Sequence, residues 1–136
     1  MGAWSADSFG NDDACDWASE LEASADLSVV ESALDRVLEA GDGYLEAPDA
    51  SQAIAAVEAL ARLQGNWGKR DSYSEIVDRW VEKVKLTPDR SVIIKAHQVL
   101  KRVLAEPSEL LELWQESDEG ETWHASVHDL MARVRA

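Results

Sequence analysis

Several features common in other protein classes are missing from this chain of 136 residues. Cys15 is the only cysteine, so no intramolecular disulfide can form, and we expect a reducing compartment such as the cytoplasm. No run of about 18 apolar residues occurs, which excludes an ordinary transmembrane helix. The first residues also lack the basic flank and apolar stretch of a secretory signal.

Basic side chains are scarce, because 13 Lys and Arg stand against 27 Asp and Glu, giving a net charge of −14. Residues 1–49 contain thirteen acids and only Arg36 as a base, a net of −12. Residues 62–102 have a net charge of +5, and residues 106–121 contain seven acids and no base. Such charge disfavours nucleic acid and anionic membranes as partners and favours a basic protein. The alternative explanation is that the negative charge only keeps the protein soluble.

No segment shows sustained alternation of apolar and polar residues, and no internal repeat occurs at a solenoid period. Apolar residues instead recur three and four positions apart. The pattern predicts an all-α single domain, a bundle of six or seven helices spanning 1–136. The expected helices are 11–23, 28–40, 49–64, 72–84, 87–106, 108–117 and about 121–135.

Residues 87–106 form the longest stretch with one strongly apolar side, and we expect the other helices to pack on it. Thr87 is the predicted N-cap, Pro88 suits the first helical position, and Pro107 prevents continuation. Capping boxes are predicted at three further helix starts: Ser28 with Glu31, Asp49 with Gln52, and Ser72 with Glu75.

Residues 1–10 show no helical period but contain Trp4 and Phe9. Two large aromatic side chains among small residues predict an arm packed on the bundle. Asn11 follows as a good N-cap, with Asp12 and Asp13 in the first turn of the next helix.

This opening resembles the signature of an uncharacterised bacterial family, domain of unknown function 4259, in which M-G-x-W is followed by a Phe and by N-D-D-A-x-D-W. The matching residues are Met1, Gly2, Trp4, Phe9, Asn11, Asp12, Asp13, Ala14, Asp16 and Trp17. The similarity continues through Tyr44 and Leu45, the alanine-rich segment, and Leu113-Trp114. Ser5 stands where the family usually has Gly. The family carries no established enzyme activity, so the resemblance supports the predicted fold and leaves the function open.

Two acidic regions and one loop tryptophan are the candidate partner-binding residues: Asp12, Asp13, Asp16, Glu20, Trp67, Glu109, Glu112 and Glu116. The first three could also ligate a hard cation, but Asp12 and Asp13 are adjacent and point in different directions, so capping of the helix start is the favoured explanation. Trp67 lies in a Gly-Asn-Trp-Gly loop, either exposed to a partner or folded back over the helix ends.

His124 and His128, four residues apart, have the spacing of a pair of metal ligands, but they lack the H-E-x-x-H pattern. We therefore expect no metal, no cofactor and no catalytic residue. The hypothesis is a binding domain for a basic protein, such as an immunity protein, an antitoxin or an inhibitor that mimics DNA. The alternatives are a self-associating structural protein and a metal-dependent enzyme using the two histidines.

Overall fold

The computed structural model describes residues 5–135, and these form seven helices and no strand. The helices are α1 (Asp12–Glu22), α2 (Ser28–Glu39), α3 (Ala47–Leu63), α4 (Glu75–Val84), α5 (Arg90–Val103), α6 (Glu109–Gln115) and α7 (Gly120–Arg133). The predicted all-α bundle is therefore confirmed. None of these helices is long and apolar enough to cross a membrane.

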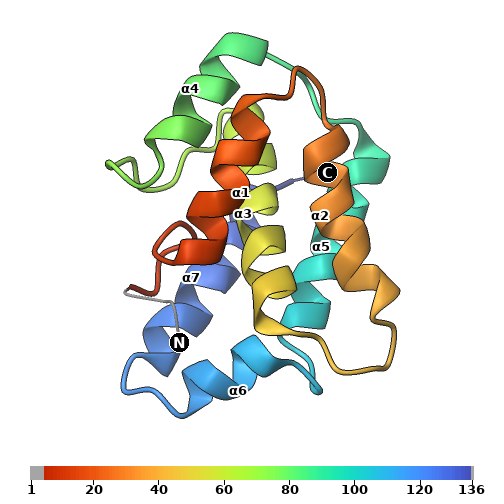
Figure 1. Cartoon of the computed structure of the whole chain (residues 1–136), viewed down its shortest axis with the longest axis vertical. Coiled ribbons are helices and arrows are strands. Elements are labelled where there is room, and N and C mark those ends of the chain that lie inside the picture. Colours follow the sequence, from red (N-terminus) through yellow and green to blue (C-terminus); the bar gives the residue numbers. More distant parts are fainter. Residues whose placement is uncertain (1–4, 136) are drawn as a thin grey trace.

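The helix at the centre of the bundle is α3, and not the predicted stretch 87–106. In Figure 1, α3 runs through the middle of the molecule, and it contacts all six other helices. Every residue from Ala50 to Arg62 except Gln52 is buried. A helix surrounded on all sides has no polar face, so its apolar residues form no stripe. The stripe of α5 instead marks a helix with one side in water.

The ends of α1 and α5 are set by side-chain caps. The Asn11 Oδ1 accepts a hydrogen bond from the Ala14 N–H at 2.8 Å, as predicted. For α5 the prediction of Thr87 is wrong, since Asp89 accepts the Val92 N–H at 3.0 Å. The helix then ends at Val103, before the predicted Glu106.

The three predicted capping boxes do not form. Ser28 is already helical, and its N–H donates to the Asp26 carboxylate at 3.0 Å. The start of α3 is capped from a distant helix, because the Glu109 Oε1 accepts the Ala47 N–H at 2.7 Å. Before α4, Asp71 takes the corresponding role. At these three helix starts the capping carboxylate comes from a residue before the helix or from α6, and not from the predicted Ser28, Asp49 or Ser72.

The segment before α1 packs on the bundle where the structure describes it. Phe9 is 4% exposed and lies 5.4 Å below the Arg62 guanidinium, and Ala6 is also buried. Trp4, the other predicted anchor, lies outside the described residues. Four tryptophans are buried in the core: Trp17, Trp80, Trp114 and Trp123.

Candidate functional site

A network of buried charges crosses the middle of α3. Glu58 and Arg62 are one helical turn apart, with the Arg62 Nε 3.2 Å from the Glu58 Oε2. The Arg62 Nη1 also donates to the Asp78 carboxylate on α4 at 2.6 Å. All three residues are less than 5% exposed. The network ties α3 to α4, because a buried charge must keep its partners.

The same carboxylate holds α7 and the N-terminal segment. Arg133 of α7 donates to both oxygens of Glu58, at 2.6 Å and 3.2 Å, and the Ser8 hydroxyl donates to one of them at 3.1 Å. Burial by itself lowers the pKa of Arg133, but Glu58 and Asp129 outweigh it and hold that pKa above its usual value. Arg133 therefore stays charged.

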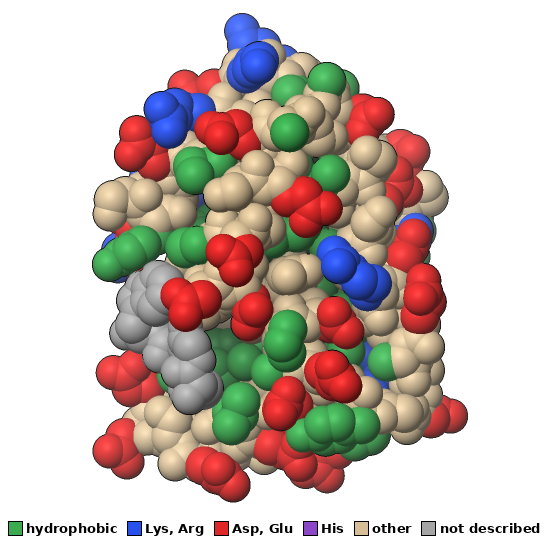
Figure 2. Space-filling view, viewed as in Figure 1, with side chains coloured by type: hydrophobic (Ala, Val, Ile, Leu, Met, Phe, Trp, Pro, Cys, Tyr) green, Lys and Arg blue, Asp and Glu red, His purple; other side chains and the backbone are tan. Residues whose placement is uncertain are grey.

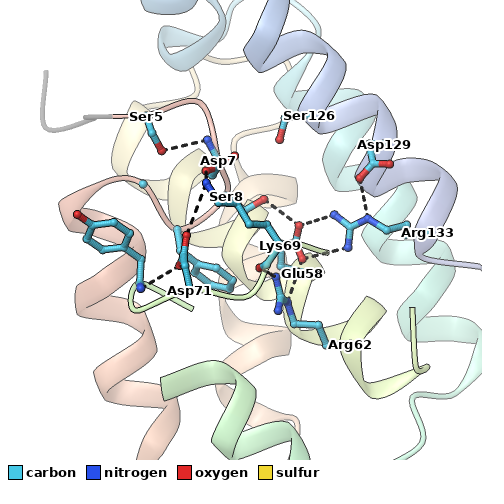
Figure 3. Close-up of a pocket in the computed structure, with 13 residues that line it drawn as sticks. Ser5, Asp7, Ser8, Glu58, Arg62, Lys69, Asp71, Ser126, Asp129 and Arg133 are labelled. Atoms are coloured by element: carbon cyan, nitrogen blue, oxygen red, sulfur yellow. Dashed lines mark hydrogen bonds and ion pairs between the residues drawn. The ribbon is translucent and has the colours of Figure 1, made fainter. Parts of the chain in front are cut away.

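A small polar cavity of about 100 Å³ lies over this network (Figure 3). Its rim includes Lys69, whose Nζ lies 3.1 Å from the Asp7 carboxylate. The labelled side chains in the close-up point toward one another, and Ser8 donates to a carboxylate that two arginines already neutralise. No histidine or cysteine lines the cavity among the described residues. The arrangement joins the N-terminal segment to α3 and α7.

A second cluster of charge lies on the surface and contains acids only. We call it the acidic face and define it by seven residues: Asp12, Asp13, Asp16, Glu46, Asp49, Glu109 and Glu112. They come from α1, from the start of α3 and from α6. Figure 2 shows acidic side chains over the whole of this face of the molecule, including the lower half where α6 and the start of α3 lie, and Lys and Arg side chains at the top near α4 and at mid-height. The fold has thus brought carboxylates from two acidic regions of the sequence onto one face.

At the α1 side of the acidic face, the carboxylates influence one another. Partial burial raises the pKa of Asp13 first, and the negative charges of Asp16, Asp12 and Asp49 raise it further. The same surroundings act on Cys15, whose pKa is raised by burial and then by neighbouring aspartates. A thiol with a raised pKa is a poor nucleophile at neutral pH.

At the α6 side, Tyr44 lies among three glutamates. Its hydroxyl donates to Glu112 at 2.8 Å, and this bond, with the charges of Glu112, Glu109 and Glu46, raises the pKa of Tyr44 to about 12. The ring is 53% exposed. Tyr44 is therefore an aromatic side chain available at the surface within the acidic face, and sequence patterns did not identify it as a contact residue.

None of the seven carboxylates forms an ion pair with Lys or Arg anywhere in residues 5–135. The ion pairs among the described residues lie elsewhere: around Glu58, at Lys69 in the loop after α3, on α4, and between α2 and α5. Glu109 and Glu112 do accept hydrogen bonds, from the Ala47 N–H and the Tyr44 hydroxyl. The negative charge of the acidic face is therefore not neutralised within the described chain.

Three predicted contact residues are not among the seven that define this face. Glu20 and Glu116 are exposed, in the last turn of α1 and directly after α6, four positions along the chain from Asp16 and Glu112. Trp67 is half-buried between two guanidinium groups, 5.7 Å from that of Arg62 and 4.2 Å from that of Arg70. The loop tryptophan is thus folded back onto the molecule, which was the alternative interpretation of its sequence context.

The histidines of α7 lie side by side, with the rings of His124 and His128 4.5 Å apart. No group of three or more His, Cys, Asp or Glu side chains able to hold a metal occurs in the part of the chain that the structure describes. The pair thus lacks a third ligand there. His97, expected to be satisfied by a neighbour, hydrogen-bonds the Val134 carbonyl.

Comparison with the curated proteins and with the solved structures gives no match. A family model described as a domain of unknown function, DUF4259, matches residues 2–126. This match covers the helices from α1 to α6 and the first half of α7. The chain therefore belongs to the DUF4259 family.

Proposed function

We propose that this protein is a cytoplasmic interaction domain that binds a basic protein through the acidic face. The observation that carries the proposal is the set of seven surface carboxylates, from three separate parts of the chain, without a basic partner among residues 5–135. Two pKa shifts support it: the charges of Asp16, Asp12 and Asp49 add to the effect of burial in raising the pKa of Asp13, and those of Glu112, Glu109 and Glu46 add to the hydrogen bond that raises the pKa of Tyr44.

Crowded like charges destabilise the folded state, so an isolated domain gains nothing in stability from this arrangement. A basic partner would relieve the repulsion, speed the encounter and reject acidic competitors. Tyr44 would add apolar and hydrogen-bonding contact area within the charged surface. A toxin neutralised by an immunity protein or antitoxin, or a nucleic-acid-binding protein blocked by an acidic mimic, has this complementary chemistry.

The test uses a variant of the acidic face and a matched control. Asp13, Asp16 and Asp49 are replaced by Asn in the variant, and Glu22, Glu75 and Glu82 by Gln in the control. Both sets remove three negative charges, but the control residues lie at the end of α1 and on α4. Circular dichroism first verifies that both variants keep the helical fold.

Each protein is then used to capture partners from a lysate of its host at low and high salt, and captured proteins are identified by mass spectrometry. We expect a basic protein that binds the wild type and the control, is lost from the variant, and is released as salt rises. A partner that remains bound to the variant at high salt would contradict the proposal. Self-association of the chain alone, measured by light scattering, would favour the structural alternative.

A further inference from the structure

An open groove of about 650 Å³ lies where α6 and α7 meet the end of α5. Trp114 and Trp123 line its floor, with ring centroids 6.0 Å apart and nearly parallel planes, and only a small part of each ring is accessible, since each residue is 5% exposed. The buried Leu111 and the half-buried Leu104 complete the apolar lining. The volume is within the range of about 300–1,000 Å³ typical of ligand sites. The groove is therefore large enough to take a side chain and part of its peptide.

The turn that closes one end of the groove is fixed by Gly120. A Cβ at this position would lie 2.4 Å from the Trp114 carbonyl oxygen, a backbone atom that cannot move aside without shifting α6. The backbone of Gly120 thus packs directly against the end of α6 beside the groove.

The charged residues that line the groove are acids, Asp118 and Glu121, and no Lys or Arg lines it among the described residues. His124 is the remaining titratable lining residue. The groove shares α6 with the acidic face, since Leu111 lines the groove and Glu112 follows it in the face. An apolar surface with acids beside it complements an apolar side chain flanked by cations.

We propose that this groove binds a basic segment of the partner protein, with an apolar side chain against Trp114 and Trp123 and Lys or Arg side chains beside Asp118 and Glu121. The inference rests on the proposed function, and it identifies where the partner protein would make its apolar contact. The acidic face supplies long-range attraction, whereas the groove supplies the apolar anchor that hot spots of interfaces require. An acidic segment of the same apolar content would be repelled.

The test uses three labelled helical peptides as probes. The first peptide carries both Lys and Leu on one face of its helix. The second is the same peptide with Ala in place of Leu, and the third is the first peptide with Glu in place of Lys. Fluorescence anisotropy measures their affinity for the wild type and for two variants of α7. Ala125→Arg places a bulky cation at an exposed position that lines the groove, and Ala132→Arg places it two turns further along, about 10 Å away.

We expect the wild type and Ala132→Arg to bind the Lys/Leu peptide most tightly and not to bind the Glu/Leu peptide. Ala125→Arg should weaken Lys/Leu binding by about tenfold or more, to the level of the Lys/Ala peptide, because it fills the groove and repels cations. Equal affinity of the two variants for the Lys/Leu peptide would overturn the inference. So would tight binding of the Glu/Leu peptide.

The acidic-face variant with Asn at 13, 16 and 49 separates this inference from the proposed function. If that variant loses the host partner while Ala125→Arg keeps both partner and peptide, the proposed function stands and the groove inference fails. If Ala125→Arg loses the Lys/Leu peptide while the acidic-face variant keeps both peptide and host partner, the groove inference stands and the acidic face does not bind the partner.

Discussion

The Glu58 carboxylate in the middle of α3 pairs through both oxygens with Arg133 near the end of α7, 75 positions along the chain. Arg62 shares the same carboxylate, and each arginine has one further carboxylate partner: Asp78 for Arg62 and Asp129 for Arg133. The pair connects the central helix to the last one. It also connects them to the N-terminal segment, through Ser8.

Replacing Glu58 by Gln should destabilise the protein strongly. The change leaves Arg62 and Arg133 close together without their shared counter-charge, and breaking a buried pair costs on the order of 3–5 kcal/mol. Urea denaturation monitored by circular dichroism measures the loss. Glu39→Gln, at an exposed position, is the control and should change stability by less than about 0.5 kcal/mol. Equal midpoints for the two variants would show that the network contributes nothing.

Truncating Phe9 should show how firmly the N-terminal segment packs. Phe9 is buried against Arg62, and loss of a buried Phe side chain costs about 3–5 kcal/mol. Ile94→Ala on α5 is the control, because Ile94 is exposed and its truncation should have little effect. A Phe9→Ala variant as stable as the Ile94 variant would mean that this segment leaves the bundle in solution.

Asp13→Asn should stabilise the protein at neutral pH. The folded pKa of Asp13 lies above its unfolded value of 3.8, so its favourable contribution is present below that value and is lost as pH rises through the folded pKa. At neutral pH the charged form is therefore unfavourable, and Asn removes it. The gain should shrink toward low pH, where Asp13 is protonated in both states.

Asp89 provides the opposite case. Thermal unfolding measured over a range of pH tests both the Asp13 and the Asp89 variants. Its pKa is lowered by hydrogen bonds from Ser91 and Val92, so its contribution is present above the unfolded pKa and is lost as pH falls through the folded pKa. Asp89→Ala should thus destabilise at neutral pH, with a loss that shrinks in acid. The same sign of effect for both variants would contradict the assigned charge environments.

The rate at which Cys15 is alkylated reports the electrostatic effect of the acidic-face carboxylates, and it can be measured on the isolated protein. Burial raises the pKa of the thiol, and Asp12 and Asp16 raise it further. Replacing both aspartates by Asn should move the midpoint of the pH–rate profile with iodoacetamide to lower pH, because the thiolate is the reactive form. Glu22→Gln with Glu75→Gln is the control. An unmoved midpoint would show that the carboxylates do not act together at this site.

Sequence patterns predicted the helices because one-sided apolar periodicity, Asn11 and the left-handed Gly41 that ends α2 are local signals. They failed to identify α3 as the centre, since a helix buried on all sides loses the periodicity being sought. They also missed the charge network. Glu58 and Arg62 stand one turn apart in an otherwise apolar helix, which was a usable signal, but Asp78 and Arg133 join them only through tertiary packing.

The acidic face was predicted in part. Charge counts marked residues 1–49 and 106–121, but could not show that the fold places Asp49 near Asp13, or Glu109 and Glu112 near Tyr44. The groove was not predicted, because Trp114 and Trp123 carry the same pattern as any core tryptophan. What distinguishes them is the open space beside them, which depends on how α6 and α7 meet.

The most direct test of the acidic face is the affinity of the captured basic protein measured against salt concentration, by calorimetry with the wild type and with the variant carrying Asn at 13, 16 and 49. We predict that affinity for the wild type falls steeply as salt rises, and that the variant binds more weakly at low salt with a shallower dependence. Identical affinities and identical salt dependence for the two proteins would contradict the account.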